Sequence, residues 1–188
     1  MKRSLLLAIP VACAATGAVA DAERYSFDSV HSQIIFFASH VGFTMSEGEF
    51  TEFSGTVTFD QDAPENSSVE VTIDTTSLDM DHEPWDAHMK SADFFDVESH
   101  PTATFASTRV NVTGDATGTI TGDLTLLGQT RPVTLDVTFN KAGEFRDSYR
   151  AGFSATASLK RSDWGMNFGI PAVGEDVDLR IEAELVRQ

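Results

Sequence analysis

The sequence predicts an all-β fold, an eight-stranded antiparallel β-barrel with one short helix around residues 83–92. Apolar and polar side chains alternate at period two through most of the chain, which is typical of half-buried strands. Clusters of Gly, Pro, Asn and Asp separate many of the alternating runs and predict turns. A series of antiparallel strands leaves two free edges unless the sheet closes, and closure into a barrel removes them.

Eight runs carry the alternation, and each is expected to place its apolar side chains on one face of the sheet. In the last run, Val177, Leu179 and Ile181 alternate with Asp178 and Arg180. The polar faces are rich in Thr, which suits exposed strand positions. In chain order, the predicted strands are residues 34–40, 53–59, 69–73, 103–107, 120–126, 133–139, 151–159 and 177–185.

The alternation is lost between residues 79 and 101, and a short helix is expected in its place. Pro84 suits the first turn of a helix, because the N–H that it lacks would have no helical partner there. Trp85, His88 and Met89 have the i, i+3 and i+4 spacing of one helical face. The helix is therefore predicted to run from about residue 83 to about residue 92.

A barrel of eight strands is just wide enough to be filled by its own side chains or to hold one small ligand. The inward positions combine small residues, such as Ala38 and Gly122, with large aromatic residues, such as Phe53 and Phe153. Small inward side chains leave volume, and an empty apolar void costs stability. The pattern fits an apolar tunnel with a lipophilic guest, and it fits a core in which Phe and Ala interdigitate equally well.

The charge of the chain excludes several classes of partner. Its 188 residues include 29 Asp and Glu against 13 Lys and Arg, which gives a net charge of −16. Nucleic acids and anionic lipid headgroups both require a positive protein surface. The hydrophobic fraction of 41% is too high for a disordered acidic chain, and the length fits a single domain.

Residues 1–20 have the features of a secretory signal peptide, which would leave residues 21–188 as the folded domain. Lys2 and Arg3 precede an apolar stretch, and Ala18 and Ala20 supply the small residues of a cleavage site. The sequence therefore predicts export, with the periplasm as the expected location. Cleavage would remove Cys13, the only cysteine. The less favoured alternative is that Cys13 carries the lipid anchor of a lipoprotein.

The polar residues do not form a recognisable metal or catalytic motif. His82 and His88 are six residues apart, not the four that place two ligands on one helical face. Asp86 and His88 are the only candidates for acid–base chemistry, and no nucleophile-elbow or phosphate-loop motif accompanies them. His40 shares the inward face of its strand and stands at the strand end, so it is expected at the mouth of the barrel.

Several segments in the same order resemble the YceI-like family of polyisoprenoid-binding proteins. The resemblance covers essentially the whole chain after residue 20. It implies a lipocalin-like barrel, export to the periplasm and binding of a long isoprenoid chain in the barrel interior. Trp85 stands where the family often has Arg, which removes a charged contact to a lipid head. The segments are DSVHS at 28–32, GEFTEFSG at 48–55, DAHMKSADFFDV at 86–97, GDLTLLGQTRPV at 122–133 and RSDWGM at 161–166.

The sequence therefore predicts a non-catalytic carrier or store for a polyprenyl or ubiquinone-type lipid, with no cofactor, metal or nucleic acid. A lipid-modifying enzyme that uses the same cavity and an integral eight-stranded outer-membrane barrel are the alternatives, and a homodimer is left open. The predicted ligand-binding residues are Phe36, Ala38, His40, Phe43, Phe53, Trp85, His88, Met89, Phe94, Phe95, Phe105, Leu124, Phe153 and Trp164.

Overall fold

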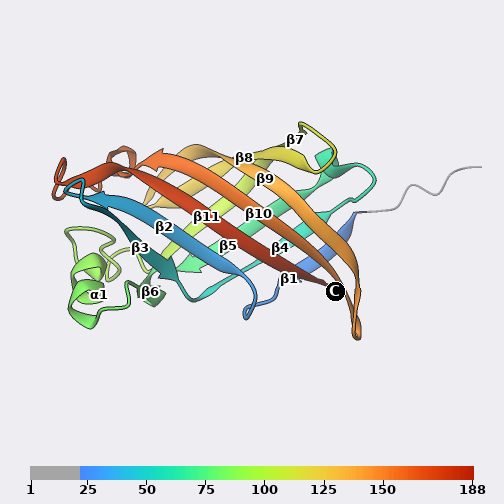
Figure 1. Ribbon diagram of the computed structural model, residues 1–188, viewed down its shortest axis with the longest axis horizontal. Coiled ribbons are helices and arrows are strands. Elements are labelled where there is room, and N and C mark those ends of the chain that lie inside the picture. Colours follow the sequence, from blue (N-terminus) through green and yellow to red (C-terminus); the bar gives the residue numbers. More distant parts are fainter. Residues whose placement is uncertain (1–21) are drawn as a thin grey trace, which may run out of the picture.

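A computed structural model describes residues 22–188, so the predicted signal peptide of residues 1–20 lies outside the described residues. Figure 1 shows an elongated barrel of strands with the helix at one end. The strands are β1 (Glu23–Phe27), β2 (Gln33–His40), β3 (Thr44–Phe50), β4 (Phe53–Phe59), β5 (Ser68–Asp74), β6 (Leu78–Asp79), β7 (Thr102–Val112), β8 (Thr117–Leu126), β9 (Gln129–Phe145), β10 (Ser148–Lys160) and β11 (Val173–Arg187), and the helix is α1 (Glu83–Lys90). Short 3-10 turns occupy Pro64–Asn66, Thr75–Ser77 and Arg161–Trp164.

Eight of the strands form a closed antiparallel ring, which confirms the predicted fold class. Their order is β1-β4-β5-β7-β8-β9-β10-β11, and β11 pairs back with β1. Closure leaves no free edge within the ring. The inward faces carry the alternating apolar residues predicted from the sequence, so the core of the molecule lies inside the barrel.

One strand of the ring differs from the prediction. The sequence indicated residues 34–40 as the first barrel strand, whereas the ring is closed by β1, whose Tyr25 pairs with Val57 on β4 and Arg187 on β11. β2 instead pairs with β11 between Val173 and Glu182, where Ile34 lies opposite Ile181. β1 has only five residues, which is too short for an alternation to be recognised.

The sheet continues beyond β2 into two strands that the alternation did not predict. β3 pairs with β2, and the two-residue β6 pairs with the end of β3. The inward face of β3 includes Gly48, where a Cβ would lie 2.4 Å from both Met80 Sδ and Phe36 Cζ. Packing therefore requires a glycine at a position where the alternation calls for a larger apolar residue.

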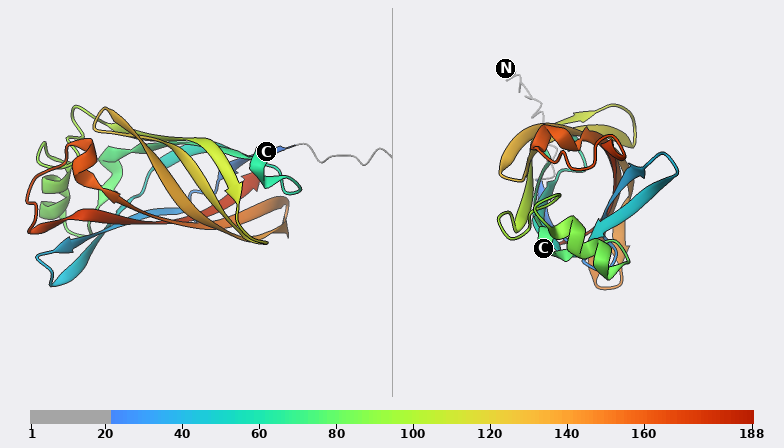
Figure 2. Two further views of the ribbon diagram at one scale, coloured as in Figure 1. Left: turned by 90° about the horizontal axis from the view of Figure 1, so that it is seen from above. Right: turned by 90° about the vertical axis from the view of Figure 1, so that its left-hand side faces the viewer.

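The helix confirms the predicted segment, because α1 covers Glu83–Lys90 with Pro84 in its first turn. A side-chain bond fixes its start, since the Met80 N–H donates to Asp86 Oδ1 at 2.7 Å. Figure 2 shows α1 at the same end of the barrel as the 3-10 turn Arg161–Trp164 and the β2–β3 turn. Within residues 22–188, no helix combines the length and apolar character needed to cross a membrane.

Candidate functional site

The barrel contains an apolar cavity of about 460 Å³. Volumes in this range are typical of pockets that enclose a small organic ligand. Many wall residues are only half-buried although they point inward, because they border empty space and not other side chains. Nine strands contribute residues to the wall, among them Phe27, Ile34, Val57, Val71, Phe105, Leu124, Val137, Phe153 and Ile181.

Aromatic side chains close the barrel at the end that carries α1. Phe36, Phe50 and Phe95 pack against one another with ring centroids 5.4–5.9 Å apart. Phe94, Leu78, Met80 and Met166 are buried in the same cluster, which we call the plug. Phe53 and Ile73 contact the plug and also line the cavity. The interior is thus solid at the helix end and hollow beyond it.

Polar groups border the cavity at the opposite end. The segment 61–68 and the β7–β8 turn contribute Gln61, Ser68, Asn111 and Thr117 to its lining. The Tyr149 hydroxyl donates to Gln61 Oε1 at 3.1 Å and fixes that amide beside the opening. No Lys, Arg or His lines the cavity among the residues that the structure describes. The site therefore combines an apolar chamber with neutral hydrogen-bonding groups at one end.

The closing strand β1 seals this end of the wall. Tyr25 is 2% exposed and packs against Phe59 and Leu185, both of which line the cavity. Its hydroxyl donates to Glu23 Oε2 at 3.2 Å. Burial first, and the nearby Glu23 carboxylate second, raise the pKa of Tyr25 to about 12.

Four of the fourteen predicted ligand-binding residues line the cavity. They are Phe53, Phe105, Leu124 and Phe153, from four different strands. Trp164 is buried in a second cluster with the inward-facing residues Phe105, Val133 and Leu135, and its indole N–H donates to the Leu124 carbonyl at 3.2 Å. Trp164 thus packs against residues of the cavity wall and does not itself line the cavity.

The other nine predicted residues lie toward the helix end. Phe36, Phe94 and Phe95 are buried in the plug and Met89 packs against it. The remaining five belong to β2, the turn after it and α1: Ala38, His40, Phe43, Trp85 and His88. His40 and Phe43 are exposed, and Phe43 reaches 85%. The structure therefore separates these residues from the cavity, and their contact with a ligand stays a prediction.

His88 belongs to an exposed aromatic contact at this end. Its ring packs edge-on against Phe94 and Phe168, with centroids 5.1 and 5.3 Å away. Its Nε2 lies 3.1 Å from Asp93 Oδ2, whereas Asp86 bonds to the Met80 backbone. The two candidates for acid–base chemistry thus have different partners.

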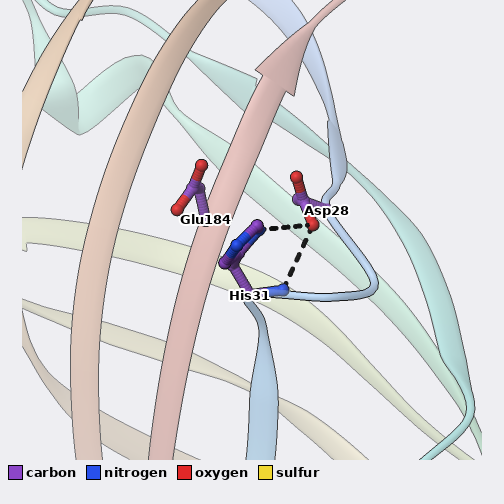
Figure 3. Close-up of side chains that lie close together, drawn as sticks. All are labelled: Asp28, His31 and Glu184. Atoms are coloured by element: carbon purple, nitrogen blue, oxygen red, sulfur yellow. Dashed lines mark hydrogen bonds and ion pairs between the residues drawn. The ribbon is translucent and has the colours of Figure 1, made fainter. Parts of the chain in front are cut away.

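One group of possible metal ligands occurs outside the barrel wall. Asp28, His31 and Glu184 each offer a ligand atom, all within 4.8 Å of one another (Figure 3). However, Arg150 Nη1 donates to Asp28 Oδ2 at 2.6 Å and also to Glu184 Oε1. The hydrogen bond from Arg150 lowers the pKa of Asp28 to about 2. The guanidinium already balances both carboxylates, so this cluster is an ion-pair network.

A buried cation organises the loop beside the plug. Arg161 is 3% exposed, and its guanidinium donates to the carbonyls of Gly174, Met166, Phe168 and Val173 at 2.7–3.0 Å. Burial lowers the pKa of Arg161. Four carbonyl dipoles replace the lost water, which makes Arg161 the anchor of residues 165–174.

The family of the chain follows from a comparison with known proteins. The model of the YceI-like domain matches residues 25–185. The chain belongs to the YceI-like family. Among its relatives are UPF0312 proteins from Ectopseudomonas mendocina and Pectobacterium atrosepticum, each 40% identical over the whole of this chain and over 100% and 99% of their own lengths.

Solved YceI-like structures share the barrel. BcnA from Burkholderia cenocepacia has a TM-score of 0.75 at 26% identity, over 84% of this chain and 98% of its own. A YceI protein from Campylobacter jejuni has a TM-score of 0.74 at 26% identity, over 80% of this chain and 90% of its own. A polyisoprenoid binding domain from Saccharophagus degradans shares the fold, with a TM-score of 0.62 at 16% identity, over 87% of this chain and 98% of its own.

Sequence reasoning missed the residues at the open end of the cavity. Gln61, Ser68, Asn111 and Thr117 lie in or next to connections, where no periodic pattern marks their direction. The apolar wall residues Val137 and Ile181 carry a usable signal, because each occupies an inward position of its alternating run.

Proposed function

We propose that the protein binds an isoprenoid lipid, of the polyprenyl or ubiquinone type, with the tail inside the barrel, and that it carries or stores this lipid in the periplasm without chemical change. The apolar cavity carries the proposal, because its wall offers contacts to a hydrocarbon tail from all sides. The Saccharophagus degradans domain is named for polyisoprenoid binding, which makes prenols and quinones the first ligands to test.

Burial of the tail supplies the affinity. Each CH₂ group that leaves water contributes roughly 0.8 kcal/mol, so a few isoprene units suffice for tight binding. The wall belongs to a closed sheet, which limits the ordering that binding requires. The plug sets the depth of the chamber, so the tail is expected to enter from the end near the β7–β8 turn.

The polar end favours a neutral head group. Gln61, Asn111 and Thr117 can donate and accept hydrogen bonds to a hydroxyl or quinone oxygen. The charged residues at the lining, Asp115 and Glu182, are both acidic. A prenol or quinone is therefore expected to bind more tightly than the matching diphosphate, whose negative charge these carboxylates repel.

Filling the chamber tests this function. Val137 points into the cavity from β9, so Val137→Trp is expected to fill part of the chamber. In a displacement assay with a fluorescent lipophilic probe, the apparent affinity for ubiquinone is expected to fall about tenfold or more, because a well-buried part of the tail loses its place. The matched control is Thr138→Trp, because the adjacent side chain is exposed on the outside of the same strand.

Native mass spectrometry of the same variants provides the decisive comparison. Parent and Thr138→Trp proteins are expected to retain an adduct of lipid mass, and Val137→Trp is expected to lose it. Equal ligand occupancy in Val137→Trp, or a parent protein that takes up neither prenols nor quinones, would contradict the proposal.

The direction of the side chains weighs against the outer-membrane alternative. The inner wall is apolar, and the outer faces carry threonines and charged residues such as Asp178 and Arg180. Transmembrane barrels have the opposite arrangement, with the apolar band on the outside. Osmotic-shock release without detergent is the corresponding measurement.

A further inference from the structure

The turn between β2 and β3 forms an exposed apolar projection. Val41, Phe43 and Met45 are 53%, 85% and 52% exposed, and we call these three residues the hairpin tip. Figure 2 shows the β2–β3 hairpin extending outward from the barrel wall in both views. Such side chains in a monomer indicate an interaction site when they are clustered and not scattered.

Val41 in the hairpin tip has an unfavourable backbone conformation for a β-branched residue. Val41 and Gly42 have φ of 54° and 74°, and the Phe43 N–H donates to the His40 carbonyl at 3.0 Å. The bond closes a β-turn within the loop between the paired residues His40 and Thr44, and positive φ at both central positions favours Asn or Asp at the first of them. A β-branched residue with positive φ is a genuine outlier. An exposed Val at this position is therefore unfavourable for the fold and suggests a contact that uses it.

The tip is also free of charge in a strongly acidic protein. No Asp, Glu, Lys or Arg occurs between residues 33 and 46, although the chain has a net charge of −16. The adjoining loop, residues 164–174, has none either, and it is tied to the tip by a bond from the Val41 N–H to the Ala172 carbonyl at 2.6 Å. The loop adds Phe168, which is 46% exposed. The tip and this loop can therefore enter an apolar phase without desolvating a carboxylate, ammonium or guanidinium group of their own.

The size of the tip decides between a protein partner and a membrane. A stable dimer buries roughly 800 Å² on each partner, from 20–30 residues, which three side chains on one turn cannot supply. β6 covers the end of β3 at Glu49 and Phe50, and self-pairing along the part of the edge that stays free would bring Glu47 of one copy close to Glu47 of the other. A bilayer interface, in contrast, accepts a few aromatic and aliphatic side chains at the headgroup level.

We propose that the hairpin tip inserts into the interfacial region of a zwitterionic phospholipid bilayer and docks the protein reversibly on it. Val41, Phe43 and Met45 enter the interface, while the acidic barrel remains in water. The docking does not use the cavity, so this proposal can be tested independently of lipid binding inside the barrel.

Vesicle sedimentation with phosphatidylcholine vesicles tests the docking on the full chain. The parent protein is expected to partition onto the vesicles, and Phe43→Ser is expected to reduce the partition coefficient about tenfold, as the loss of one buried aromatic side chain implies. At about 0.02 M NaCl the protein is expected to bind phosphatidylglycerol vesicles more weakly than phosphatidylcholine, because the net charge is repelled. This difference is expected to shrink at about 0.3 M NaCl.

Two further variants separate docking from folding. Phe145→Ser removes an aromatic side chain that is 53% exposed at the opposite end of the barrel, where β9 ends, and is expected to leave partition unchanged. Val41→Asn suits the turn better, so it is expected to raise the melting temperature while it lowers partition. Phe43→Trp is expected to show a blue shift of emission on vesicle addition that the parent protein lacks.

Three results would overturn the proposal. The first is equal partition of the parent and Phe43→Ser proteins, and the second is an equal loss of partition in Phe145→Ser and Phe43→Ser. The third is self-association that depends on Phe43, measured by sedimentation velocity, without vesicle binding. Cavity binding of ubiquinone by Phe43→Ser is measured in parallel and is expected to be unchanged, which keeps this test distinct from that of the proposed function.

Discussion

Single polar residues hold the turn between β1 and β2, where β11 changes its pairing partner from β2 to β1. Arg150 on β10 joins Asp28, in the turn between those strands, to Glu184 on β11. Ser32 is 6% exposed, and its hydroxyl donates to the Glu184 carbonyl while it accepts the Glu184 N–H, at 3.1 and 3.0 Å. These bonds fix the DSVHS segment to the wall. The motif was recognisable in the sequence, but its role needs partners about 120–150 residues away.

Replacement of Asp28 by Asn is expected to destabilise the protein by about 1–2 kcal/mol at pH 7. The pKa of Asp28 is lowered to about 2 by Arg150, so the carboxylate contributes fully above its unfolded pKa of 3.8. That contribution declines as the pH falls from about 4 to about 2. Urea unfolding of the parent and Asp28→Asn proteins across this range should converge at the acid end. The exposed Asp136→Asn serves as control, and a pH-independent difference would contradict the assignment.

At the scale of elements, strands were predicted correctly where one face of the strand borders the apolar interior and the other face borders water. β9 and β11 separate the cavity from water, so their sequences alternate clearly. β3 does not, because Gly48 must make room for Phe36 and Met80. α1 was predictable from Pro84 and its apolar spacing, but the same spacing could not show that the segment after it would form a plug. That outcome depends on the space left inside the closed ring.

The plug is expected to limit the length of the tail. Phe95→Ala removes a ring that is 7% exposed and lies against Phe36 and Phe50, and it should cost about 3–5 kcal/mol in the free energy of unfolding. Phe53 and Ile73 pack against the plug and also line the cavity, so a longer prenol is expected to reach the vacated space and to restore more stability to Phe95→Ala than to the parent protein. Thermal shift with prenols of increasing length measures this.

The control is Phe43→Ala, at an exposed position, which should change the free energy of unfolding by less than about 0.5 kcal/mol. Identical length dependence in parent and Phe95→Ala would show that the plug does not bound the chamber.

For the whole molecule, the sequence predicted a closed barrel and left open whether it is hollow or filled. The structure contains both solutions in one interior, a plug at the helix end and a chamber beyond it. Alternation alone could not distinguish them, because Phe36 in the plug and Phe153 at the chamber wall occupy equivalent inward positions. The difference arises from the segment carrying Phe94 and Phe95, which enters one end of the ring, and from the polar connections that border the other.

Because the chamber is lined from around the ring, loss of the ligand should loosen the barrel as a unit. A ligand at 100 times its Kd stabilises the folded state by about 2.7 kcal/mol. Removal of lipid by organic extraction and refolding should therefore speed amide hydrogen exchange in β4, β5 and β7 through β11, whose residues line the cavity. Exchange in α1 and at Phe94 and Phe95 should change little, since none of these described residues lines the chamber. Addition of ubiquinone should reverse the change in the parent protein and fail to do so in Val137→Trp. Exchange that changes only in the 61–68 connection would instead place the ligand at the rim.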